Sequence, residues 1–180
     1  GLGDVYKRQT GYIALHCIQQ LLYKGYAVNG SIRSPERKNE VIDALKNCNT
    51  STENLNLFNF DLTNDEGWDE GMQGCDYLLH IASPLALQNY EEDYFVKPAV
   101  EGAMRALNFA KKHNVKKVVL TSSVAAIFET GTEKVFYDES DWSDPNSPKI
   151  SNYAKSKTLA EKAAWNFVEQ EDNPFEFTVL

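Results

Sequence analysis

The sequence has no run of about twenty apolar residues, although 42% of its 180 residues are hydrophobic. A helix that crosses a membrane needs such a run, so we expect no transmembrane span. Positive charge is also scarce: the formal net charge is −8. This argues against a nucleic-acid partner, because proteins that bind nucleic acids gather Lys and Arg on one face. The composition instead suits one globular domain with a sizeable core.

Cysteine is rare as well. The three cysteines, Cys17, Cys48 and Cys75, are odd in number, widely spaced and without the spacing of metal ligands. We therefore expect reduced thiols in a cytoplasmic protein that has no metal site.

The two ends do not fit a complete domain. An apolar strand is expected just before Thr10, and Gly1 to Gln9 supply none. Asp4 to Gln9 resemble the translated end of a sequencing adapter, so we interpret residues 1–9 as non-native and exclude them from the fold. The other end stops on Phe175 to Leu180, a run of β-forming residues. We therefore expect residues 10–180 to be an incomplete domain of a longer protein, whose substrate region is absent.

Apolar strands alternate with helical patterns over this domain. Such alternation predicts an α/β fold with a doubly wound, Rossmann-like parallel sheet that lacks its first strand. The expected helices are 12–24, 34–46, 64–72, 94–113 and 153–169. The expected strands are 26–32, 55–60, 75–81, 115–120 and 175–180. We expect the stretch 128–150, which is rich in Asp, Ser and Pro, to form a loop over the functional site.

Ser123, Tyr153 and Lys157 form the most informative constellation. A tyrosine phenol ordinarily titrates near pH ~10, so proton exchange at neutral pH needs a neighbour that favours the phenolate. Lys157 is that neighbour, because residues at i and i+4 share a helical face. The strand 115–120 leads to Ser123 at its carboxyl end, where open α/β sheets bind ligands, and the hydroxyl could bond a substrate carbonyl.

Two plainer interpretations of these residues stay open. Tyr153 and Lys157 could be exposed residues of an ordinary helix, since a Tyr-x-x-x-Lys spacing is common by chance. Ser123 could satisfy the backbone at the end of a strand.

A dinucleotide site is suggested by Gly11, Tyr12, Ile13 and Ala14 at a strand-to-helix turn. They match the last part of Gly-x-x-Gly-x-x-Gly/Ala, in which the glycine lets the backbone approach a pyrophosphate. The first glycine is missing, because Arg8 stands at its position. A plain helix start is therefore the alternative.

The residues after the second expected strand favour NADP over NAD. Arg33 lies 22 residues after Gly11, where an NAD site would place an acidic residue on the ribose hydroxyls. A cation there suits a 2′-phosphate, and Arg37 and Lys38 follow close by. The alternative is a solvated basic turn.

Two later strand ends complete the predicted cofactor path. Asp61 and Leu62 follow the third expected strand, and the carboxylate could accept a hydrogen bond from an adenine amino group. A loop aspartate that caps the next helix is the alternative. Ala82 and Ser83 follow the next strand and offer small residues beside the nicotinamide, before Pro84 turns the chain outward.

These motifs together resemble the extended short-chain dehydrogenase/reductase family, also described as the NAD-dependent epimerase/dehydratase family. The likeness is strongest to its branch of dihydroflavonol, cinnamoyl-CoA and aldehyde/ketone reductases. The segments that carry it, besides Arg33 and Asp61-Leu62, are 12–14, 80–84, 97–102, 121–123 and 153–165.

The resemblance implies an oxidoreductase that transfers a hydride from NADPH to the carbonyl of an aldehyde, ketone or dihydroflavonol-like substrate. Tyr153 would donate the proton, Ser123 would polarise the oxygen, and Lys157 would assist Tyr153 and hold the nicotinamide ribose. A monomer or homodimer is expected, with the dimer as the family's default. The alternatives are a nucleotide-sugar epimerase or dehydratase, a non-catalytic NADP sensor, and a fragment that is itself inactive.

Overall fold

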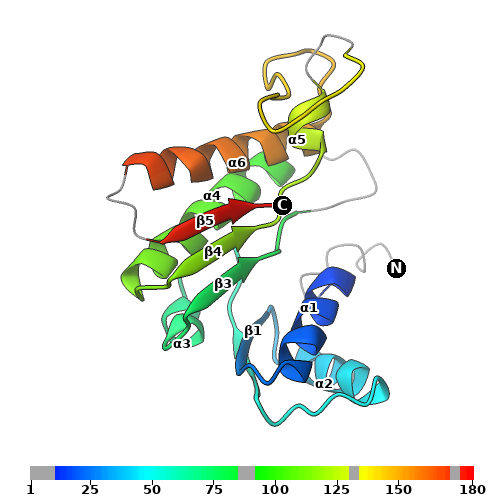
Figure 1. Cartoon of the computed structure of the whole chain (residues 1–180), viewed down its shortest axis with the longest axis vertical. Coiled ribbons are helices and arrows are strands. Elements are labelled where there is room, and N and C mark those ends of the chain that lie inside the picture. The colour runs from blue at the N-terminus through cyan, green and yellow to red at the C-terminus, as the bar shows by residue number, and fades with distance from the viewer. Residues whose placement is uncertain (1–10, 85–91, 130–133, 171–174) are drawn as a thin grey trace.

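The computed structural model describes residues 11–84, 92–129, 134–170 and 175–180, in which helices and parallel strands alternate (Figure 1). The elements are α1 (Tyr12–Tyr23), β1 (Val28–Ile32), α2 (Arg37–Asn47), β2 (Leu55–Asn59), α3 (Trp68–Met72), β3 (Tyr77–His80), α4 (Glu92–Lys112), β4 (Lys117–Leu120), α5 (Ala125–Phe128), α6 (Asn152–Gln170) and β5 (Glu176–Val179). Every strand pair is parallel, which confirms the predicted α/β fold.

All the expected helices and strands occur, but several ends differ for local reasons. The helix expected from Ser34 begins at Arg37, because the Ser34 carbonyl instead closes a turn with the Arg37 amide. The short helix expected from residue 64 begins at Trp68, because Gly67 adopts φ +80, in the left-handed region. The four-residue helix α5 was not predicted. Residues 134–150 contain neither helix nor strand, as expected for the described part of the loop.

The strands of the described residues form two sheets, with an interruption between β1 and β3. β1 pairs with β2, Val28 lying opposite Leu55, and β3 pairs with β4, which pairs with β5. Doubly wound sheets of this class have the strand order 3-2-1-4-5-6. The described order, β2-β1 followed by β3-β4-β5, matches it with an interruption at the position of strand 1. The predicted absence of an opening strand falls on residues 1–9, which lie outside the described residues.

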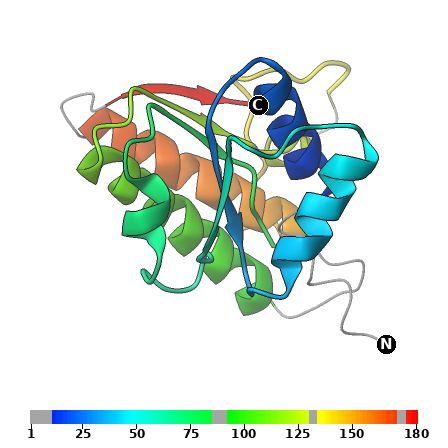
Figure 2. The ribbon, with the colours of Figure 1, turned by 90° about the horizontal axis from the view of Figure 1, so that it is seen from below.

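The helices α4 and α6 cover one face of β3, β4 and β5 (Figure 2). α4 and α6 pack together on one face, over a core that includes Val118 and Leu120 of β4. Small side chains, Ala99 and Ala103 of α4 and Ala160 of α6, form the contact between these helices. This close approach fixes the helix that carries Tyr153 and Lys157 against the sheet. In the part of the chain that the structure describes, no helix is both long enough and apolar enough to span a membrane.

We predict that Gly102→Ala destabilises the protein, although alanine favours a helix by about 1 kcal/mol over glycine. A Cβ at Gly102 would lie 2.9 Å from Cβ of Leu62, which is 4% exposed and cannot move aside. Overpacking of this kind costs about 1 to 3 kcal/mol. Urea unfolding measures the change. The matched control Glu101→Ala, on the exposed side of the same helix, should shift the free energy of unfolding by less than about 0.5 kcal/mol. A stabilised Gly102→Ala variant would contradict the described packing.

Candidate active site

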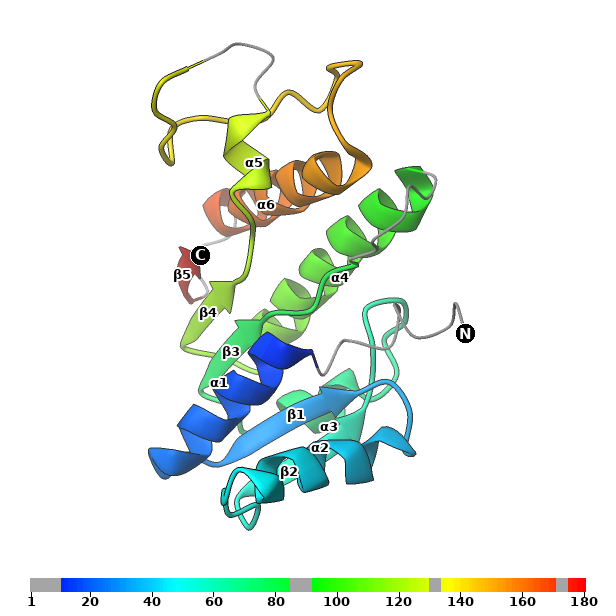
Figure 3. The same ribbon diagram turned by 90° about the vertical axis from the view of Figure 1, so that its right-hand side faces the viewer.

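The residues predicted to bind cofactor and substrate follow the carboxyl ends of four parallel strands. Arg33 follows β1, Asp61 lies two residues beyond β2, Ala82 lies two residues beyond β3, and Ser123 lies three residues beyond β4. The arrows of β1, β3 and β4 point to roughly the same side of the molecule (Figure 3). The predicted residues are therefore gathered along one edge of the fold, where open α/β sheets bind ligands.

Lys157 lies almost buried between α6 and the end of β4, with 6% of its surface exposed. Its Nζ donates a hydrogen bond to the Thr121 carbonyl at 3.1 Å. Burial lowers the pKa of Lys157 from 10.5 to about 8, and the negative charge of Glu161 opposes this shift. The interpretation of Lys157 as an exposed helix residue is therefore wrong.

Tyr153 is held one turn before Lys157 at the start of α6. The Ser151 hydroxyl accepts a hydrogen bond from the Ala154 amide at 3.1 Å and so caps the helix. The Glu129 carboxylate in turn accepts hydrogen bonds from the Ser151 amide at 2.8 Å and the Ser151 hydroxyl at 3.0 Å. These contacts tie the first turn of α6 to the segment that leaves β4. They thereby fix the backbone position from which the half-buried Tyr153 side chain extends.

Ser123 is half-buried, and its hydroxyl oxygen accepts a hydrogen bond from the Ala125 amide at 3.2 Å. The serine thus satisfies the backbone at the strand end, as the plainer interpretation proposed. That bond uses only a lone pair of the oxygen. The hydroxyl hydrogen stays available to a substrate oxygen, so the two roles are compatible.

The predicted pyrophosphate contacts lie at the start of α1. Gly11 precedes the helix with extended backbone angles and no side-chain cap, while Tyr12 and Ile13 are 78% and 58% exposed. The first amides of a helix have no partner within the helix and suit an anion. The part of the motif before Gly11 lies outside the described residues.

The other predicted cofactor contacts differ in how accessible they are. Arg33 is half-buried and Lys38 is exposed, while Arg37 forms an ion pair with Glu40 at 3.1 Å. The Asp61 carboxylate accepts hydrogen bonds from the Thr63 amide and hydroxyl, which closes a local turn rather than capping α3. Leu62 is buried against α4, so only its backbone remains for a cofactor contact.

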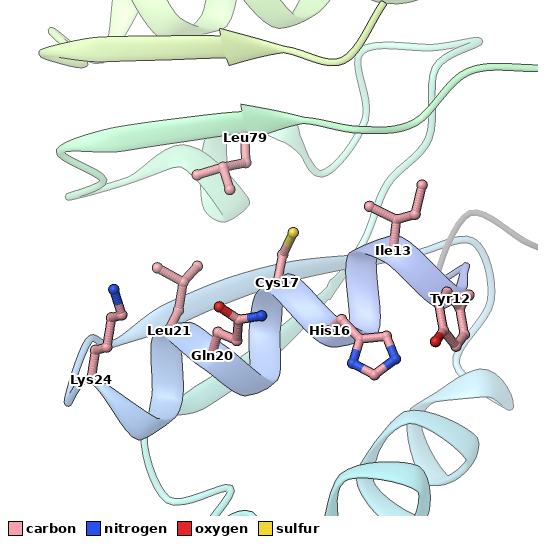
Figure 4. Close-up of a pocket in the computed structure, with 8 residues that line it drawn as sticks. All are labelled: Tyr12, Ile13, His16, Cys17, Gln20, Leu21, Lys24 and Leu79. Carbon is pink, nitrogen blue, oxygen red and sulfur yellow. The ribbon is translucent and has the colours of Figure 1, made fainter. Parts of the chain in front are cut away.

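An apolar pocket of about 420 Å³ lies between α1 and β3, beside the interruption of the sheet (Figure 4). Leu79 points from β3 toward Cys17 of α1, with Ile13 and Leu21 on either side. Leu79 and Tyr77 are 39% and 55% exposed, which is unusual for a strand inside a doubly wound sheet. The pocket shows that the side chains of α1 do not fill the space between this helix and β3.

Sequence reasoning missed two residues beside Lys157. His80 ends β3 and is 7% exposed, and burial together with the Lys157 charge lowers its pKa from 6.5 to about 4. Glu161 follows Lys157 by four residues and accepts a hydrogen bond from the Ser122 hydroxyl at 2.5 Å. Both line a small cavity with Lys157 that does not reach Ser123 or Tyr153. The i, i+4 spacing of Lys157 and Glu161 was visible in the sequence and could have revealed the second of them.

The fold is thus an α/β domain that carries Ser123 beyond β4 and Tyr153 and Lys157 on α6. The chain belongs to the NAD dependent epimerase/dehydratase family, whose model matches residues 9–180. It is 40% identical over 169 residues to vestitone reductase of Medicago sativa, covering 89% of this chain and 52% of the relative. It is 38% identical over 173 residues to an anthocyanidin reductase of Vitis vinifera, covering 89% and 50%.

A solved structure agrees with these sequence relatives. The yeast methylglyoxal/isovaleraldehyde reductase Gre2, complexed with NADPH, superposes with a TM-score of 0.79 at 30% identity, covering 94% of this chain and 53% of that chain. The predicted fold class and family are thereby confirmed. The chain spans about half the length of the relatives that it matches.

We predict that acid destabilises the protein through His80. Because the unfolded state takes up this proton near pH 6.5 and the folded state only near pH 4, stability is lost as the pH falls between these values. The full loss is about 3 kcal/mol, at 1.36 kcal/mol per pH unit. The free energy of unfolding of wild type minus that of His80→Leu, measured at several pH values, isolates this contribution. A difference that stays constant from pH 7 to pH 4 would contradict the described burial of the imidazole.

Proposed function

We propose that the full-length protein is an NADPH-dependent carbonyl reductase in which Ser123, Tyr153 and Lys157 carry the reaction. The observation that supports this most strongly is the Lys157 ammonium, held nearly buried one helical turn from Tyr153 and bonded to the end of the strand that leads to Ser123. The reductases among the relatives support the reaction class.

Each residue has a distinct task in this proposal. Bound NADPH supplies a hydride to the carbonyl carbon. The Ser123 hydroxyl donates a hydrogen bond to the substrate oxygen and holds it beside Tyr153, which gives its phenolic proton to that oxygen. The Lys157 ammonium stabilises the phenolate that remains, and a pKa of about 8 keeps most of it charged at neutral pH.

The donor set around Lys157 fits a nicotinamide ribose. An ammonium has three N–H donors, and among the described residues only the Thr121 carbonyl accepts one of them. Unsatisfied donors of a nearly buried cation are costly, so ribose hydroxyls would be stabilising partners. Ala82 and Ser83 are small and half-buried beside the same strand end, which leaves room for the ring.

Arg33 and Lys38 would select NADPH at the other end of the cofactor. Both follow β1, and the start of α1 lies near the same edge, with amides that suit a pyrophosphate. A guanidinium binds a phosphate through two parallel hydrogen bonds, which NAD(H) cannot accept at its free 2′-hydroxyl. Asp61 completes the proposed path near the adenine.

We predict that Tyr153→Phe lowers kcat of the full-length protein at least about 100-fold, the usual contribution of a positioned general acid. Turnover is measured as NADPH oxidation with a panel of aromatic and aliphatic aldehydes and ketones. The affinity for NADPH, measured by fluorescence, should stay within a few-fold of wild type. The control Tyr26→Phe, an exposed tyrosine just before β1, should keep full activity. Retained turnover in Tyr153→Phe would refute the assigned proton donor.

We predict that Arg33→Ser weakens NADPH binding about 10- to 100-fold and leaves NADH binding unchanged, because a hydrogen bond between charged groups contributes about 1.5 to 3 kcal/mol. The matched control is Lys46→Ser, an exposed cation at the end of α2, which should change neither affinity. Equal losses for NADPH and NADH would show that Arg33 supports the local fold instead of reading the 2′-phosphate.

The second candidate is a nucleotide-sugar epimerase or dehydratase, which the family description itself includes. Such an enzyme would use the same tyrosine but would act on sugar nucleotides without net consumption of NADPH. Conversion of sugar nucleotides, together with no oxidation of NADPH by simple carbonyls, would favour it. Tight NADPH binding without turnover of either substrate class would favour a cofactor sensor.

A further inference from the structure

Glu161 connects the helix that carries Tyr153 and Lys157 to the end of β4. Its carboxylate oxygen Oε2 accepts the hydrogen bond from the Ser122 hydroxyl, and Oε1 accepts one from Trp165 Nε1 at 3.3 Å. Trp165 is in turn packed edge-on against Phe177 of β5, with ring centroids 4.8 Å apart. The carboxylate is therefore held in place from two directions.

Thr121 and Ser122, which directly follow β4, form hydrogen bonds with two consecutive turns of α6. The Thr121 carbonyl accepts from Lys157, and the Ser122 hydroxyl donates to Glu161. The Ser122 amide also donates to the Leu180 carbonyl at 2.7 Å, which ties this position to the strand on its other side. Ser123 is the next residue, so its distance from Tyr153 depends on these bonds.

Glu161 is also the only carboxylate among the described residues that lines the cavity containing Lys157. The other groups that face Lys157 are His80 from β3, Thr121 and Ser122 from β4, and the alanines of α4, while Tyr153 precedes it on α6. Among these groups His80 is neutral near pH 7, because burial opposes its protonation and lowers its pKa to about 4. The Glu161 carboxylate is thus the one negative charge that balances the ammonium from within this part of the molecule.

We propose that Glu161 is a positioning residue of the proposed reductase: it keeps a negative charge beside the Lys157 ammonium and holds Ser122, and with it Ser123, against α6. This inference rests on the proposed function for its catalytic consequence, but not for its electrostatic one. The electrostatic consequence is a property of the folded protein and is measurable without turnover.

The decisive experiment titrates Lys157 in the full-length protein by NMR of selectively 13C-labelled lysine side chains, with the Lys157 signal assigned by Lys157→Arg. Glu161→Gln removes the charge but can keep both contacts, because its amide oxygen can accept from Trp165 and its NH₂ can donate to Ser122. We expect the titration midpoint of Lys157 to fall by about 0.5 to 1 pH unit, since loss of the nearby anion favours the neutral amine. The exposed Glu169→Gln on the same helix is the control and should leave the midpoint unchanged.

The pH profile of kcat provides the catalytic test. We expect kcat to fall on the alkaline side of this profile, as Lys157 loses its proton. Glu161→Gln should move this alkaline limb to lower pH by the same amount as it moves the NMR midpoint. Ser122→Ala keeps the charge and breaks the bond, so it should lower kcat about 10-fold without moving the limb. An unmoved NMR midpoint in Glu161→Gln would overturn the electrostatic role, and unchanged kcat in Ser122→Ala would overturn the role in holding Ser123.

A shifted midpoint in a protein without reductase activity would refute the proposed function but would support the charge interaction between Glu161 and Lys157. The two failures are therefore distinguishable.

Discussion

Lys157 of α6 is nearly buried against the carboxyl end of β4, and the packing of α4, α6 and β4 depends on keeping its ammonium there. Removing an ammonium from water is costly unless acceptors and opposite charge surround it. Glu161 supplies the charge from the next turn of the same helix, whereas Thr121 can supply its carbonyl only because α6 lies close to the strand. The small residues between α4 and α6, Ala99, Ala103 and Ala160, permit that approach. The position of the Lys157 ammonium therefore depends on the small side chains that let α6 pack against α4.

The other half of the molecule is organised around an interruption. β1 and β2 form one sheet and β3, β4 and β5 another, and α1 lies over the region between them without closing on β3. The exposed side chains of Tyr77 and Leu79 mark the edge where a doubly wound sheet would continue. Gly11 therefore lies beside the sheet of β1 and β2, at the start of α1, whereas Ser123, Tyr153 and Lys157 lie beside the sheet of β3, β4 and β5.

Much of the fold was predictable because periodicity reports which face of an element is buried. The end of the strand before Ser123 and both ends of the helix from Tyr153 were located to within one residue, whereas the strand begins two residues later than expected. The start of α2 and the short helix α5 were not, because turn hydrogen bonds and a four-residue helix leave little trace in a sequence.

The buried state of His80 could not be foreseen from the sequence, since it depends on α4 and α6 covering one face of β3. The burial of Leu62 was not foreseen either: its side chain belongs to the core, and the predicted cofactor contact stays a prediction for its backbone. The roles of Arg33, Lys38, Asp61 and the catalytic trio remain predictions.

If Tyr153 and its neighbours serve the transfer of a hydride to a carbonyl, the hydride itself can be followed from cofactor to product. The full-length protein would be incubated with an aldehyde or ketone and NADPH that carries deuterium at the transferable C4 position, and the products analysed by mass spectrometry and NMR. We expect deuterium on the former carbonyl carbon of the alcohol, one atom for each NADPH oxidised. Sugar nucleotides that are converted without net oxidation of NADPH, or carbonyl compounds that remain free of deuterium despite cofactor binding, would contradict it.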